Sequence, residues 1–236
     1  SNMDTKLTGK TRIESDLIGA REIPAEALYG VQTLRGIENF SISKFRLSEY
    51  PLFIKGLAIT KMAAAMANFE LGLLTVEQKD AIIAACGEIL DGKHHDQFPV
   101  DMIQGGAGTT TNMNANEVIA NRALELMGHE RGEYQYCSPN DHVNCSQSTN
   151  DAYPTAIHIG MYFKHLQLLP HLEELIASFR KKGEEFANII KMGRTQLEDA
   201  VPMTLGQTFN GFASILEHEV KNLDFAAQDF LTVNMG

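Results

Sequence analysis

Two long stretches of this 236-residue chain carry apolar residues at the spacing of an α-helix, and they constrain the fold most strongly. The first stripe consists of Met161, Leu168, Leu172, Leu175, Phe179 and Phe186. The second consists of Leu205, Phe209, Phe212, Leu216, Val220 and Leu223. The first predicts a helix from Thr155 to Ile190, about 50 Å long at about 1.5 Å per residue. Helices with one apolar face must pack against other helices, so we expect an elongated bundle shared between subunits.

Shorter helices are predicted upstream. Residues 11–50 contain several Gly and Pro breakers and predict turns with room for a small hairpin. Phe53–Leu74 is rich in Ala, Met and Leu and predicts a helix. Thr75 opens a capping box for the next helix, which Gly92 ends, and Asn114–Met127 predicts a third, which Gly128 ends. Strand signals are few, so the predicted fold is mainly α-helical.

A polar segment divides the chain. Residues 132–154 are dense in Ser, Asn and Asp and predict a loop and a domain boundary. We therefore expect a small N-terminal helical domain over 1–141 and the beginning of a long central helical bundle over 142–236. The helical pattern is still running near Gly236, so we expect the bundle domain to be truncated there.

Composition excludes several classes of function. A net charge of −10 argues against binding nucleic acid or an anionic membrane through the global field. We find no apolar run that predicts a membrane span and no signal peptide, and three cysteines fit neither a disulfide framework nor a zinc site. A reducing cytoplasm is therefore the expected compartment. An anionic substrate would need local donors to hold it against the negative field.

The first chemistry-bearing segment is the Gly-rich stretch 104–114, directly before a predicted helix. Glycines let backbone N–H groups approach a ligand closely, and a helix N-terminus adds unpaired N–H groups. Thr and Asn side chains add neutral donors, which suits a carboxylate. The alternative is a flexible turn whose Thr or Asn caps the helix.

Two further segments resemble the first in being rich in uncharged donors at helix ends. One is 138–154, which places Ser148, Thr149 and Asn150 before a long helix and also contains His142. The other is 193–204, between the two long helices. Their alternatives are a solvated loop and a helix-to-helix connection with Asp199 as a cap and Pro202 at a first helical position. Some forty residues separate the segments, so an oligomer meeting at helix ends would bring them together.

Metal binding is not predicted. His94 and His95 are adjacent and point in different directions, whereas a helical metal pair needs histidines four residues apart.

The three segments, in this order, resemble the signatures of the aspartase/fumarase superfamily over residues 12–236. The matching stretches are 105–109 with 112–118, 147–155, and 193–195 with 199–200. Residues 97–101, 125–129 and 201–207 are similar to the aspartase branch. Four positions depart from the fumarase pattern: Ala107 and Thr149 stand where serine is usual, and Gln196 and Ser138 stand where histidine is usual. Gln196 donates a hydrogen bond but does not titrate, and with Ser138 we do not expect the second anion site of fumarases.

The resemblance implies a lyase that eliminates ammonia reversibly from L-aspartate to give fumarate, through a carbanion stabilised by its carboxylate. It implies no organic cofactor, a dicarboxylate substrate and a homotetramer whose sites are built from several subunits. The substrate-binding residues it indicates are Thr109, Ser148, Thr149, Asn150, Thr195 and Gln196. The family's base is a serine on a mobile loop, and we find no such signature here, so the catalytic base stays unassigned.

Three rival interpretations remain. Fumarate hydratase is the nearest, and it acts on L-malate. A catalytically inert helical fragment would keep the signatures as structure alone. An argininosuccinate- or adenylosuccinate-type lyase would need room for a large leaving group, which the aspartase-like stretches argue against.

Overall fold

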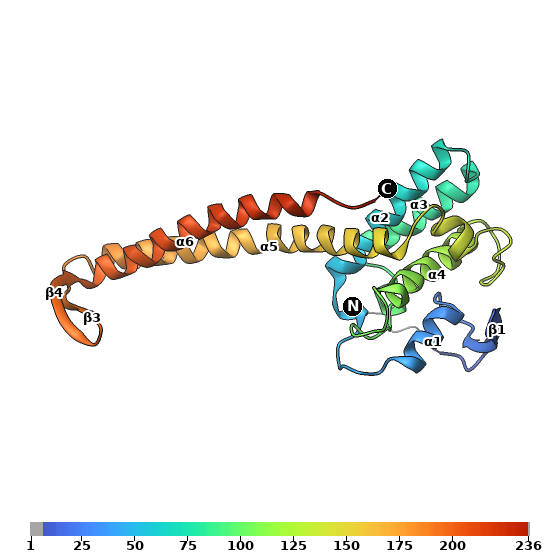
Figure 1. The fold of residues 1–236 in the computed structure, drawn as a ribbon, viewed down its shortest axis with the longest axis horizontal. Coiled ribbons are helices and arrows are strands. Elements are labelled where there is room, and N and C mark those ends of the chain that lie inside the picture. Colours follow the sequence, from blue (N-terminus) through green and yellow to red (C-terminus); the bar gives the residue numbers. More distant parts are fainter. Residues whose placement is uncertain (1–6, 236) are drawn as a thin grey trace. The chain divides into compact units, whose positions relative to one another are not determined.

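The computed structural model describes residues 7–235, and it is mainly helical as predicted (Figure 1). The strands are β1 (Thr11–Asp16), β2 (Gly19–Pro24), β3 (Ile190–Thr195) and β4 (Glu198–Thr204). The helices are α1 (Val31–Asn39), α2 (Pro51–Glu70), α3 (Val76–Leu90), α4 (Thr109–Leu126), α5 (Thr149–Glu185) and α6 (Leu205–Ala227). Short helical turns lie at Leu47–Glu49, His95–Gln97, Pro139–Val143 and Gln228–Leu231.

The chain forms two compact units whose boundary falls inside α5. The first comprises residues 7–161 with 233–235, and the second comprises Tyr162–Thr232. The boundary that the sequence predicts between residues 141 and 142 stays a prediction.

The first unit has a core of three packed helices, α2, α3 and α4. Ile54, Ile82, Ile119 and Leu124 are all fully buried there. Burial of such aliphatic side chains is the main favourable term in folding. The β1–β2 hairpin predicted within residues 11–50 pairs antiparallel through all six positions, from Thr11 opposite Pro24 to Asp16 opposite Gly19.

Helix α2 meets the length and composition criteria for a membrane span, which the sequence analysis did not anticipate. Half of its most apolar window is buried inside the protein. Its contacts are with α3 and α4, which is the environment of a core helix.

The local end signals act as predicted. Thr75 accepts a hydrogen bond from the Gln78 N–H at 3.1 Å, and the Gln78 side chain returns one to the Thr75 N–H at 3.1 Å. Gly92 and Gly128 follow their helices with φ of 89° and 82°, a left-handed conformation that glycine adopts without a Cβ penalty.

Helix α5 begins at Thr149, upstream of the predicted Thr155, although Pro154 lies inside it. Proline has no N–H for the carbonyl four residues back, which is that of Asn150. The Asn234 side-chain amide donates to this carbonyl at 2.9 Å instead. A partner distant in the sequence therefore replaces the lost helical hydrogen bond.

In the second unit, α5 and α6 pack side by side through an aromatic cluster. Phe179 lies 6.0 Å from Phe209 and 5.6 Å from Phe212 between ring centroids. Gly183 and Gly206 allow a close backbone approach, since a Cβ on Gly206 would lie 2.4 Å from the Gly183 carbonyl oxygen. The two stripes therefore pack against each other at Phe179, Phe186 and Phe209, whereas Met161, Leu168 and Leu175 of the first stripe are exposed.

The segment between these helices connects them, but without the Asp199 cap and the Pro202 helix start of the alternative interpretation. It is an antiparallel hairpin of β3 and β4. Its two-residue turn holds Gln196 and Leu197 at φ of 50° and 67°, and positive φ at both positions suits the twist of paired strands. Pro202 lies in β4 and not at a helix start, and Thr204 caps α6 in place of Asp199.

Candidate functional site

The Gly-rich segment forms a turn that ends at the N-terminus of α4. Gly108 is the N-cap residue with φ of 85°, and Thr109 is exposed as the first residue of the helix. A Cβ on Gly108 would lie 2.3 Å from the ring of Tyr153, in the first turns of α5. Glycine is therefore required both for backbone conformation and for close packing. This contact places the beginnings of α4 and α5 next to each other.

The polar loop ends in a cap that uses a predicted site residue. Ser148 Oγ accepts from the Asn150 N–H at 3.1 Å, and the Ser148 N–H donates to the Asp151 carboxylate at 3.0 Å. This reciprocal pair satisfies orphan donors at the start of α5. Ser148 and Asn150 are exposed, and Thr149 is half-buried.

Asparagine side chains join the two helix N-termini. Asn112 Nδ2 donates to Thr149 Oγ1 at 3.2 Å and to Asn144 Oδ1 at 3.1 Å. Lys61 Nζ donates to the same Asn144 oxygen at 3.0 Å. Two segments far apart in the sequence, those of Thr109 and Thr149, are thereby held together by one cluster of side-chain donors.

Thr195 and Gln196 belong to the second unit, where both are exposed on the β3–β4 hairpin. Arg194 in the same hairpin pairs with Asp199 at 3.0 Å. The described structure therefore brings together Thr109, Ser148, Thr149 and Asn150 within one unit, and presents Thr195 and Gln196 on the other.

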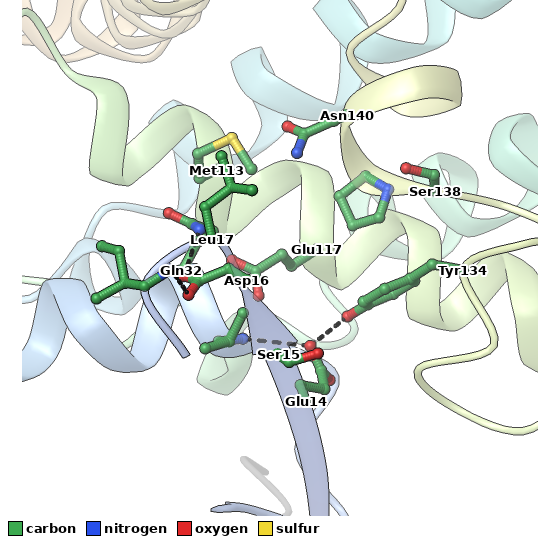
Figure 2. A pocket seen from close by; sticks show the side chains of 13 residues that line it. Glu14, Ser15, Asp16, Leu17, Gln32, Met113, Glu117, Tyr134, Ser138 and Asn140 are labelled. Atoms are coloured by element: carbon green, nitrogen blue, oxygen red, sulfur yellow. Dashed lines mark hydrogen bonds between the residues drawn. The ribbon is translucent and has the colours of Figure 1, made fainter. Parts of the chain in front are cut away.

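A separate cavity of about 630 Å³ lies in the first unit and holds none of the predicted site residues. Glu14, Asp16, Glu117 and Tyr134 contribute its polar wall (Figure 2). The Tyr134 hydroxyl donates to Glu14 at 2.7 Å. Glu14 pairs with Arg12 and Asp16 pairs with Arg35 at 2.8 Å, so these arginines are already engaged by carboxylates. The helix N-termini, with their unpaired N–H groups, are therefore the better anion site despite the size of the cavity.

Glu117 is a buried carboxyl group with a perturbed pKa, and it was not among the candidate site residues identified from the sequence. Its side chain is 2% exposed, and it accepts from the Thr33 N–H at 2.9 Å. Burial, followed by the charge of Glu14, raises the pKa of Glu117 to about 8. The only sequence signal was its place in the Asn-Glu-Val signature, which indicates importance and not this environment.

The histidines singled out by sequence have structural partners. His94 contacts the Glu88 carboxylate at 2.6 Å, and the His95 ring contacts the Ile89 carbonyl at 2.9 Å. His142 Nδ1 accepts from the Ser138 N–H at 2.7 Å. Burial lowers the pKa of His142, so this ring is held neutral. Within residues 7–235 there is no group of three His, Cys, Asp or Glu side chains placed to hold a metal ion.

A family model described as lyase matches residues 19–236. The chain belongs to this lyase family. It is 56% identical to the aspartate ammonia-lyase of Escherichia coli K12 over 98% of its own length and 48% of that protein. It is 56% identical to the aspartate ammonia-lyase of Helicobacter pylori J99 over 95% of this chain and 48% of that protein. The resemblance inferred from the signatures is confirmed.

Solved structures agree with this assignment. A fumarate lyase:delta crystallin from Brucella melitensis bound to cobalt has a TM-score of 0.94 and 52% identity, covering 96% of this chain and 49% of that one. Class II fumarase from Schistosoma mansoni has a TM-score of 0.88 and 37% identity, covering 96% of this chain and 48% of that one. The present chain therefore spans about half the length of the relatives that it matches.

Proposed function

We propose that this chain is part of an ammonia-lyase that converts L-aspartate reversibly into fumarate and ammonia. The observation that carries the proposal is the junction of the α4 and α5 N-termini through Asn112 and Thr149. The proposal is also supported by the 56% identity of this chain to aspartate ammonia-lyases, compared with 37% to a class II fumarase.

The chemical task is to remove a weakly acidic proton beside a carboxylate. The resulting carbanion becomes accessible when fixed donors stabilise the charge that moves onto that carboxylate. In the first unit, the Thr109 and Thr110 N–H groups have no partner among the described residues and lie at a positive helix end. The proposed carboxylate-binding groups are these two N–H groups, the hydroxyls of Thr109, Ser148 and Thr149, and the side-chain amide of Asn150.

Thr195 and Gln196 are the remaining proposed substrate contacts. Both are exposed on a hairpin whose turn geometry is set by positive φ at Gln196. We propose that a homotetramer completes each site by combining segments from different copies. The exposed apolar residues of α5 and α6, Leu168, Leu175, Phe212 and Ile215, support further helix packing in such an assembly.

We place the protein in the cytoplasm, acting on a small dicarboxylate without nucleic acid, membrane or organic cofactor. The three cysteines are free, and Cys86 and Cys137 are buried, which agrees with a reducing compartment.

The test is fumarate absorbance after addition of L-aspartate or L-malate to the purified chain, with the intact mass recorded on the same sample. A rise with L-aspartate alone supports the proposal, and a rise with L-malate alone favours a hydratase. If the chain shows no activity, calorimetry with succinate tests for the carboxylate site. Binding indicates that the site is present, and no binding indicates an inert helical fragment.

A further inference from the structure

Lys61 is a buried cation on α2 whose partners are all neutral. Its side chain is 0% exposed, and Nζ donates to Asn144 Oδ1 and Gln147 Oε1 at 3.0 Å each. No carboxylate of residues 7–235 forms an ion pair with it. Burial lowers the pKa of Lys61 to about 7, and the nearby Cys86 thiol has its own pKa raised to about 12 by burial. Placing an ammonium group here is costly, so its position calls for a reason.

Below about pH 7 the Lys61 side chain is an ammonium group, which fixes the direction of the hydrogen bonds around it because it has donors only. Asn144 must therefore turn its amide oxygen, and not its nitrogen, towards Lys61. Asn112 then has to donate to that oxygen, which it does at 3.1 Å through Nδ2. The second hydrogen of the same nitrogen goes to Thr149 Oγ1 at 3.2 Å.

The orientation of Asn112 is imposed by these neighbours. Its Oδ1 is buried and has no hydrogen-bond partner in the described part of the chain. Leaving a buried acceptor unpaired costs about 1–3 kcal/mol. The amide keeps this orientation because rotation would turn its oxygen towards Asn144 Oδ1, acceptor against acceptor.

The consequence reaches the proposed carboxylate site. Since Thr149 Oγ1 accepts from Asn112, its own O–H hydrogen is directed away from the cluster. The hydroxyl is then a donor for an incoming anion.

We propose that Lys61 is a positioning residue, which acts through Asn144 and Asn112 to present the Thr149 hydroxyl as a hydrogen-bond donor to a substrate carboxylate. This inference rests on the proposed function for its ligand, whereas the amide orientation can be tested without one. The Asn144 Nδ2 group also donates to the Gln147 carbonyl at 3.1 Å, so Lys61 and this bond favour the same amide orientation. Without the ammonium group, only the Gln147 bond holds Asn144, so Asn144 and then Asn112 rotate more readily and Thr149 turns its hydrogen inward more often.

The first test follows the side-chain amide protons of Asn112 and Asn144 by NMR hydrogen exchange. Lys61→Met removes the donors at similar volume, and Lys55→Met on the same helix is the matched control. We expect exchange about tenfold faster at both amides in Lys61→Met, as for the loss of one net hydrogen bond, and no change in the control. Unchanged exchange in a folded Lys61→Met variant would overturn the proposal.

The second test is a double-mutant cycle on succinate binding with Lys61→Met and Thr149→Val. Lys61→Met should weaken binding about tenfold when Thr149 is present and not further in the Thr149→Val background. Equal weakening in both backgrounds refutes action through Thr149. If Lys61→Met does not fold, Asn112→Asp, which lacks the donor to Thr149, should show the same loss, and full affinity would refute the relay. If the unmodified chain binds no succinate, the proposed function fails while the exchange measurement still decides the role of Lys61.

Discussion

Glu117 provides a test of how a buried carboxyl group sets the pH dependence of stability. Its Oε2 and Glu14 Oε1 lie 1.9 and 2.6 Å from one point, the Cβ position that Gly30 lacks. Two carboxyl groups this close do not both ionise in a buried site. Glu117 Oε2 is buried and has no hydrogen-bond partner among the described residues, so ionisation of Glu117 would leave a buried charge unpaired.

The sign of the effect follows from the raised pKa of Glu117, about 8 against an ordinary 4.5. Between these pH values the folded state keeps a proton that the unfolded state has lost. The contribution of Glu117 to the free energy of unfolding is therefore complete below about pH 4.5. It decreases as the pH rises and levels off above about pH 8. The slope is about 1.4 kcal/mol per pH unit, which amounts to several kcal/mol over the window.

Glu117→Gln removes this titration, because the amide is neutral throughout and its Nε2 can donate towards Glu14. We expect the free energy of unfolding of the variant, relative to that of the parent protein, to increase by about 1.4 kcal/mol for each pH unit from 5 to 8. Urea unfolding followed by circular dichroism at four pH values measures this, and exchange of the Ile119 amide reports on the first unit. The exposed Glu70→Gln variant is the control and should track the parent. Parallel stability curves for Glu117→Gln and the parent would refute the reasoning.

Three further changes test local features of the fold. Gly108→Ala should destabilise the protein by more than about 2 kcal/mol, because it adds a clash with Tyr153 to the cost of positive φ. Gly72→Ala is the control, since Gly72 has φ of 75° and no neighbour within 4 Å, and it should cost only about 1 kcal/mol. Equal unfolding midpoints for these two variants would contradict the Tyr153 contact. Thr75→Ala should cost about 1 kcal/mol through loss of the α3 cap, as seen in thermal unfolding. Thr204→Ala should cost a similar amount at α6, and no loss there would mean that the β3–β4 hairpin and not the cap sets the helix start.

Much of the fold could be predicted from the sequence, because its determinants are local. Apolar residues at helical spacing predicted the long helices, the Thr75 capping box predicted the start of α3, and Gly92 and Gly128 predicted helix ends. These signals act within a turn or two of the chain, so neighbouring residues suffice to identify them. The helix-end placement of Thr109 and Thr149 was also predicted in this way.

Tertiary structure decided what depends on partners distant in the chain. Pro154 is accommodated in α5 because Asn234 reaches the Asn150 carbonyl. The pKa of Glu117 is raised because the fold buries its carboxyl group and also brings Glu14 beside it. The sequence does not distinguish Lys61 from other helical lysines. Its hydrogen bonds to Asn144 and Gln147 form only when the polar loop packs against α2. Burial and long-range pairing set the protonation and direction of polar groups, and neither is encoded in any local pattern.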